Sequence, residues 1–78
     1  MKTARREWLY DGIQESGLTR KAVANKCSIS VRSLNAYLAG SRNISIVFLI
    51  KASSALSLDL SEAIKREARY IEGKYTAS

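Results

Sequence analysis

Apolar positions recur along the chain at intervals of three and four residues, with short polar stretches between the apolar groups. This spacing is typical of amphipathic helices that each bury one face. It predicts five helices, over residues 4–16, 20–26, 30–38, 46–56 and 59–72. Proline is absent and glycine is sparse, so little in the chain opposes helix formation. The sequence therefore predicts a single compact all-α domain of five helices over residues 1–78.

The central part of the chain predicts two short helices joined by a tight turn. Thr19 and Ser30 stand where these helices begin, and their hydroxyl oxygens are suited to accept from free backbone N–H groups of the first turn. Ala24 is small enough for a close helix crossing, and Gly40 follows the second helix, where a left-handed conformation is common. These features predict a helix-turn-helix motif over residues 19–38, which places its second helix in the DNA major groove.

The periodicity of the second helix, the recognition helix, assigns its two faces. Leu34, Tyr37 and Leu38 share one side and are expected to point inward. The opposite side carries the side chains expected to contact bases, which are Ser30, Val31, Arg32, Asn35 and Ala36. An arginine can pair with guanine and an asparagine with adenine, while valine or alanine can touch a thymine methyl group.

The motif resembles the Cro/repressor-type (XRE-like) helix-turn-helix domains of phage repressors and restriction–modification controller proteins. The resemblance covers residues 9–64 and rests on Gly17, Leu18, Thr19, Val23, Ala24, Ile29, Ser30, Leu34 and Gly40. The sequence SRNIS at 41–45 is similar to the loop that follows the recognition helix in that family. The resemblance implies a lambda-repressor-like fold, binding to double-stranded DNA and regulation of transcription.

Several positions depart from the family pattern. Arg20 stands where the family often has glutamine, and Ser28 replaces the usual glycine of the turn. The pair at 38–39 is Leu-Ala rather than Glu-Asn, and Ile44 lies near a usual proline. These departures concern the contacts with DNA more than the fold.

The net charge of +6 comes from the central part of the chain. Residues 17–57 contain no acidic side chain and six basic ones, which are Arg20, Lys21, Lys26, Arg32, Arg42 and Lys51. The two flanks together hold the other seven basic residues and all seven acidic residues. A solvated surface normally mixes the two signs, whereas a basic segment without acids suits a polyanion such as DNA.

Phosphate contacts are expected on both sides of the recognition helix. The first helix of the motif would lie across the DNA backbone, and the loop after the second would act as a phosphate clamp. The residues expected to contact phosphates are Thr19, Arg20, Lys21, Ser33, Ser41, Arg42 and Asn43. Arg5 and Arg6 are further candidates for the backbone.

The remaining apolar residues predict the core and a second interface. The core is expected to contain Trp8, Leu9, Ile13, Val47, Leu49, Ile50 and Leu56, with Phe48 in the core or an interface and Leu60 and Ile64 closing the core. Ala68 and Ile71 continue the stripe of the last helix past the core. With Tyr70 they are expected either to form a homodimer interface, which we favour, or to pack on their own domain. Residues 73–78 are expected to be a flexible tail.

Composition argues against several other classes of protein. Histidine is absent and Cys27 is the single cysteine, so neither an internal disulfide nor a multi-cysteine zinc site is expected. Cys27 is expected to fill space in the core. No catalytic motif suggests an enzyme, and no metal or cofactor is expected. No apolar run suggests a signal peptide or a membrane span, so we expect a cytoplasmic protein without a membrane partner.

The expected function is that of a transcription regulator, in the first place a repressor of phage or mobile-element type. It would read an inverted repeat as a homodimer, with RNA polymerase as a further candidate partner. Two alternatives stay open. One is a protein-interaction module on the same fold, such as an antitoxin or adaptor. The other is a monomeric DNA-binding module of a recombinase or transposase.

Overall fold

A computed structural model describes residues 5–76 of the chain. Its helices are α1 (Glu7–Ser16), α2 (Arg20–Lys26), α3 (Val31–Ala39), α4 (Ile46–Ala55) and α5 (Leu60–Thr76). No strand occurs among these residues. The predicted all-α fold of five helices is therefore confirmed.

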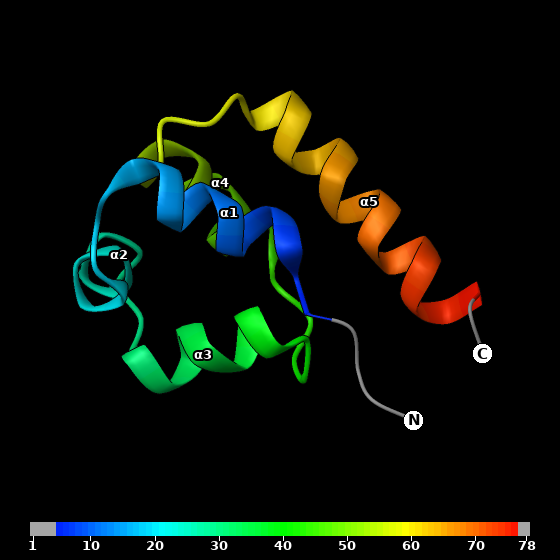
Figure 1. Cartoon of the computed structure of the whole chain (residues 1–78), viewed down its shortest axis with the longest axis horizontal. Helices are drawn as coiled ribbons and strands as arrows, with labels where there is room; N and C mark the ends of the chain where they lie inside the picture. Colours follow the sequence, from blue (N-terminus) through cyan, green and yellow to red (C-terminus); the bar gives the residue numbers. More distant parts are fainter. Residues whose placement is uncertain (1–4, 77–78) are drawn as a thin grey trace.

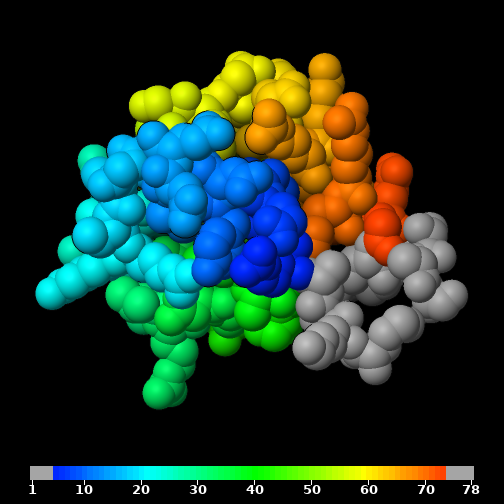
Figure 2. All heavy atoms as spheres, in the orientation of Figure 1, coloured from blue at the N-terminus to red at the C-terminus, as the bar shows by residue number. Residues whose placement is uncertain are grey.

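The helices surround one core, with α1 near the centre of the view in Figure 1. The helix α2 packs on both α3 and α4, while α1 contacts α3 and α5, and α5 packs mainly on α4. In the space-filling view α2 and α3 form one edge of the molecule, and α5 lies beyond α1 from them (Figure 2). The helix α3 and the C-terminal helix α5 therefore lie on different sides of the core.

The core takes side chains from all five helices. Its buried apolar residues are Trp8, Leu9, Ile13, Val23, Ala24, Cys27, Leu34, Leu38, Phe48, Leu49, Ala52, Leu56 and Ala63. Gly12 allows α1 to approach the end of α4 closely, since a Cβ at this position would lie 3.3 Å from Cδ1 of both Leu56 and Leu58. The core predicted for α1 is confirmed.

The core face of α4 differs from the prediction. Val47 and Ile50 were expected to be buried, but they are 57% and 48% exposed. The buried face consists of Phe48, Leu49, Ala52 and Leu56. Because α4 begins with five apolar residues in a row, at 46–50, periodicity could not decide which of them face inward.

The helix α5 is also rotated from the predicted orientation. Leu60 and Ile64 were expected to close the core, but both are exposed, and Ala63 and Glu67 are buried instead. The helix also continues past its predicted end at residue 72 to Thr76. Residues 73–76 are therefore helical rather than a tail, and positions 77–78 lie outside the described residues.

The first helix begins later than predicted. The predicted start at residue 4 lies outside the described residues, and α1 begins at Glu7, after a non-helical Arg6 with φ −82° and ψ 81°. The side chain of Arg6 is fully buried. Its Nε and Nη2 donate to the two carboxylate oxygens of Glu67, at 2.8 and 3.1 Å. The hypothesis that Arg6 reaches the DNA backbone is therefore wrong.

Candidate nucleic-acid interface

The helix-turn-helix is fixed by local hydrogen bonds at the predicted positions. The Thr19 hydroxyl oxygen accepts from the backbone N of Ala22, and that of Ser30 accepts from the backbone N of Ser33, each at 3.1 Å. Ser28 forms the turn with φ 58°, a left-handed conformation that explains why the family prefers glycine here. The caps that sequence analysis assigned to the two helices are confirmed.

The recognition helix α3 presents the predicted outer face to solvent. Leu34 and Leu38 are buried, and Tyr37 is half-buried with its ring centroid 4.5 Å from that of Phe48. The side chains proposed to contact bases are exposed at Ser30, Val31, Arg32 and Asn35 and half-buried at Ala36. The helix ends at Gly40, whose φ of 79° is left-handed, as predicted.

The loop after α3 folds back onto that helix. The Arg42 Nη1 donates to the Ser33 hydroxyl oxygen at 3.3 Å, and the Arg42 guanidinium lies 5.9 Å from the Tyr37 ring centroid. The Ser41 hydroxyl donates to the carbonyl oxygen of Ala36 at 3.2 Å. Three of the predicted phosphate-contacting residues, at 33, 41 and 42, are thus gathered along α3, and Asn43 is exposed beside them.

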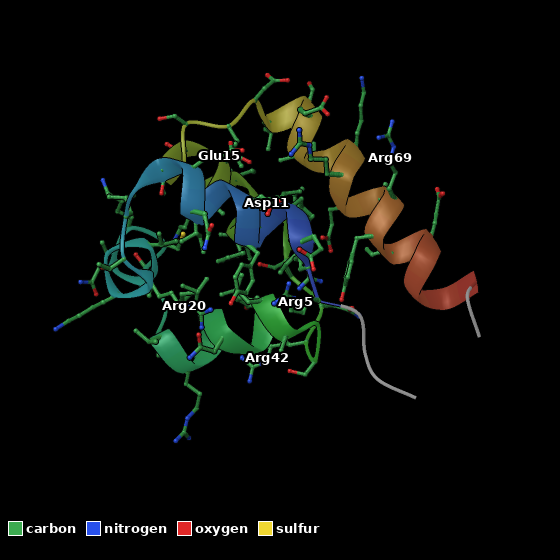
Figure 3. The ribbon with its side chains drawn as sticks, in the orientation of Figure 1. Arg5, Asp11, Glu15, Arg20, Arg42 and Arg69 are labelled. Atoms are coloured by element: carbon green, nitrogen blue, oxygen red, sulfur yellow. The ribbon has the colours of Figure 1, made fainter. Side chains whose placement is uncertain are left out.

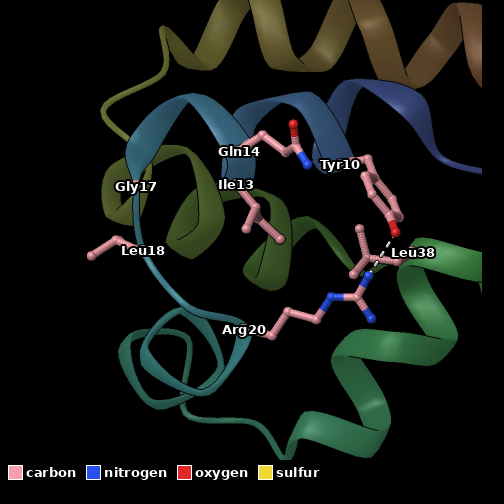
Figure 4. A pocket seen from close by; sticks show the side chains of 7 residues that line it. All are labelled: Tyr10, Ile13, Gln14, Gly17, Leu18, Arg20 and Leu38. Atoms are coloured by element: carbon pink, nitrogen blue, oxygen red, sulfur yellow. Dashed lines mark hydrogen bonds between the residues drawn. The ribbon is translucent and has the colours of Figure 1, made fainter.

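On α2, Thr19, Arg20 and Lys21 are all exposed. The Arg20 side chain turns toward α3, and its Nη1 donates to Asn35 Oδ1 at 2.9 Å. Its Nη2 donates to the Tyr10 hydroxyl oxygen at 2.8 Å (Figure 4). The sequence predicts a phosphate contact for Arg20 but not the bond to Tyr10, because nothing near residue 10 in the chain points to a partner on α2.

Arg20 and Arg42 flank α3, and the segment 17–57 that contains this helix has no acidic residue. Figure 3 shows the labelled side chains of Arg20 and Arg42 beside α3, whereas Glu15 lies at the edge of α1 that faces away from α3 in this view. All six basic side chains of residues 17–57 are exposed. Arg20, Arg32 and Arg42 therefore make the surface around α3 positive, which suits contact with a polyanion, whereas Lys26 and Lys51 line a hollow at α4.

The residues proposed for a dimer interface lie on α5. Ala68 and Ile71 are exposed, and Leu60 and Ile64 join them on the outer side of that helix. Tyr70 is half-buried, and the Arg6 guanidinium lies 4.5 Å from its ring centroid. Part of this predicted set thus packs on its own domain, and the rest leaves an apolar stripe exposed.

Cys27 is buried in the core, as expected. Burial raises the pKa of its thiol above the usual value, against a smaller opposing effect of the Lys51 charge. Among the described residues, no group of histidine, cysteine, aspartate and glutamate side chains could hold a metal ion. None of the described helices has the length and apolar character needed to cross a membrane.

Comparison with known proteins identifies the family. The profile of the family described as Helix-turn-helix matches residues 9–62, well over half of the chain. No curated protein and no solved structure gives a significant match. The matched segment contains the whole motif and most of the core described above. The chain therefore belongs to the Cro/repressor-type helix-turn-helix family of DNA-binding domains.

Proposed function

We propose that the chain is a sequence-specific regulator of transcription, in the first place a repressor, that binds double-stranded DNA as a homodimer. The observation that carries this proposal is the exposed outer face of α3, which lies beside Arg20 and Arg42 in a segment without acids. A helix flanked by cations suits the major groove, where phosphates border it on both sides. A protein-interaction module would not require a basic segment without acidic residues around α3.

The outer face of α3 supplies the proposed contacts with bases. These contacts come from Ser30, Val31, Arg32, Asn35 and Ala36. The proposed contacts with phosphates come from Thr19, Arg20, Lys21, Ser33, Ser41, Arg42 and Asn43. Arg32 is the strongest candidate for direct readout, because the described residues offer its guanidinium no hydrogen bond or ion pair and it remains available to guanine.

The proposed homodimer forms through α5. The exposed stripe of Leu60, Ile64, Ala68 and Ile71, with Tyr70 at its edge, supports this assignment because an apolar face gains free energy when a second copy covers it. A two-fold dimer would present two copies of α3 about 34–36 Å apart, one turn of DNA. Occupancy of such a site would repress by excluding RNA polymerase, or activate by contact with it.

The proposal is tested by selection of bound sites from random duplex DNA, with the full chain at one fixed, moderate salt concentration. We expect enrichment of an inverted repeat whose half-sites lie about 10–10.5 base pairs apart, or a near multiple of that spacing. The binding constant of the selected site should fall steeply as salt rises.

Other outcomes would favour the alternatives. A single ungapped half-site would support a monomeric module of the kind found in recombinases and would overturn the homodimer. Absence of any enrichment, together with binding that does not respond to salt, would overturn the DNA-binding proposal and support a protein-interaction module.

A further inference from the structure

A second exposed apolar surface lies on α4, apart from the stripe of α5. Ile46, Val47 and Ile50 are all exposed there. A hollow of about 480 Å³ beside them is lined by Lys26, Ile50, Lys51, Ser54 and Ala55. These residues come from α2 and α4, and none of them is among the residues proposed to contact DNA. This surface therefore has no role in the proposed function.

The hollow continues into a second one. Lys26 and Ala55 also line a neighbouring hollow of about 510 Å³, which extends to Leu18 and Leu58. Because the two hollows share two lining residues, they form one groove along the C-terminal half of α4. Leu18, Ala55 and Leu58 are half-buried, so each leaves part of an apolar side chain open to the groove. A partly apolar groove of this kind is typical of sites that receive the apolar face of an amphipathic helix.

The charge of the groove restricts what can bind there. Lys26 and Lys51 are exposed, and neither forms an ion pair with a described residue. The second hollow also has Glu15 in its lining, so the positive charge lies at the α4 end of the groove. Unpaired cations beside exposed apolar side chains favour a ligand that brings both carboxylates and apolar groups.

A second copy of the chain fits this groove poorly. A symmetric contact between two α4 faces would bring Lys26 and Lys51 close to their own copies, and like charges repel. The exposed charges of α5 over residues 60–72 are Glu62 and Glu72 against Lys65, Arg66 and Arg69. The helix α1 exposes Glu7, Asp11 and Glu15 but buries Trp8, Leu9 and Ile13. Neither helix therefore combines an acidic surface with exposed large apolar side chains.

We infer that the groove between the end of α2 and the outer face of α4 binds an acidic amphipathic helix of another protein. Apolar side chains of that helix would cover Ile50 and Ala55 and supply affinity by leaving water. Its carboxylates would lie beside Lys26 and Lys51 and set its direction along the groove. Since α3 takes no part in this contact, the chain can hold the partner and DNA together. The inference goes beyond the proposed function and does not depend on it.

The test is selection from a displayed library of random 16-residue peptides, long enough for about four helical turns, on the full chain. Enriched peptides are synthesised, and their dissociation constants are measured at several salt concentrations. Lys51→Glu and Ile50→Gln change the groove. Lys21→Glu and Ile64→Gln are the matched controls, because they make the same changes at exposed positions of α2 and α5. Circular dichroism shows whether each variant folds.

We expect enriched peptides with large apolar residues three and four positions apart and with aspartate or glutamate beside them. Lys51→Glu and Ile50→Gln should each weaken binding by roughly tenfold or more, as the loss of a central contact does. Lys21→Glu and Ile64→Gln should leave the affinity within about twofold, because neither residue lines the groove. A duplex with the selected DNA site should not displace the peptide.

Four results would overturn the inference while the DNA-binding proposal stands. One is enrichment of no peptide that responds to Lys51→Glu or Ile50→Gln. Another is enrichment of acidic peptides without apolar positions that Lys21→Glu weakens as much as Lys51→Glu does, which would mean a general attraction to a basic chain. Displacement of the peptide by the selected duplex would move its site to α3. Dissociation of the homodimer by Ile50→Gln, seen in sedimentation equilibrium, would mean that a second copy covers this face. Failure to select any DNA sequence would overturn the proposed function but not the groove.

Discussion

The three arginines around α3 have different surroundings, and these surroundings separate their proposed roles. Arg20 is bonded to Tyr10 and Asn35. Arg42 lies against α3 through Ser33, at the side of the helix. Arg32 is exposed on the outer face. Residues of one chemical type on one surface are therefore expected to differ in role, with Arg20 and Arg42 contacting phosphates and Arg32 contacting a base.

Replacing Arg32 and Arg42 one at a time should distinguish base contact from phosphate contact. We expect Arg32→Ala to cost about 1–3 kcal/mol on the selected site and to relax the preference at one base pair. Arg42→Ala should weaken binding to all sequences alike and lower the salt slope by about one. Titrations of selected and scrambled duplexes at several salt concentrations measure both effects. Equal weakening of every sequence by Arg32→Ala would make Arg32 a phosphate contact instead.

At the scale of elements, a buried ion pair connects α5 to the end of α3. Glu67 accepts from Arg6 and also from Trp8 Nε1, at 2.8 Å. Arg6 in turn donates through Nη1 to the backbone carbonyl of Tyr37 and through its backbone N to that of Leu38, the latter at 2.9 Å. A buried charge without its partner is costly because water no longer solvates it. The pair therefore fixes α5 in the orientation that exposes its apolar stripe.

Removal of the Glu67 carboxylate should destabilise the domain strongly. We expect Glu67→Leu to lower the free energy of unfolding by about 3–5 kcal/mol, because Arg6 would stay buried without a counter-charge. Glu62→Gln on the same helix is the control. Its partner Arg66 lies four residues later in the same helix, and both side chains are about half exposed. We therefore expect Glu62→Gln to lower the free energy of unfolding by at most about 0.5 kcal/mol. Urea unfolding followed by circular dichroism measures both, and equal effects would contradict the role given to the pair.

At the scale of the whole molecule, α3 and α5 lie on different sides of the core, as Figure 1 shows, and the exposed apolar stripe belongs to α5. A surface that contacts DNA and a surface that contacts a second copy can then be occupied together. Mutations on α5 should therefore act on dimerisation without touching any proposed DNA contact.

The double variant Ile64→Gln/Ile71→Gln tests this separation. We expect it to shift the chain from dimer to monomer in sedimentation equilibrium, because two side chains that a partner would cover become polar. Its affinity for the inverted repeat should fall at least about tenfold, while binding to a single half-site stays unchanged. The control is Ile46→Gln/Ile50→Gln, at two exposed apolar positions of α4. Dissociation by the control but not by the α5 variant would move the interface to α4.

The elements of the candidate site are more predictable from the sequence than the contacts between those elements. The exposed face of α3 followed from periodicity, since Leu34 and Leu38 could only point inward together. The bridge from Arg20 to Tyr10 and Asn35 could not be predicted, because its partners lie ten and fifteen residues away in the chain. Such pairs form only once three helices have packed. The sequence does not distinguish Arg20 from the other basic residues that turn out to be exposed.

The sequence by itself determined the features that depend on neighbours within a few residues. The starts of α2 and α3 at Thr19 and Ser30 are of this kind, because each cap accepts from a backbone N–H three residues ahead. Only the tertiary structure decided which side of α4 and α5 is buried. The partners of Arg6 on α5 lie 61 residues away, and helix rotation follows from the sum of such distant contacts. Local hydrogen bonds are encoded in short segments, whereas burial is a property of the assembled core.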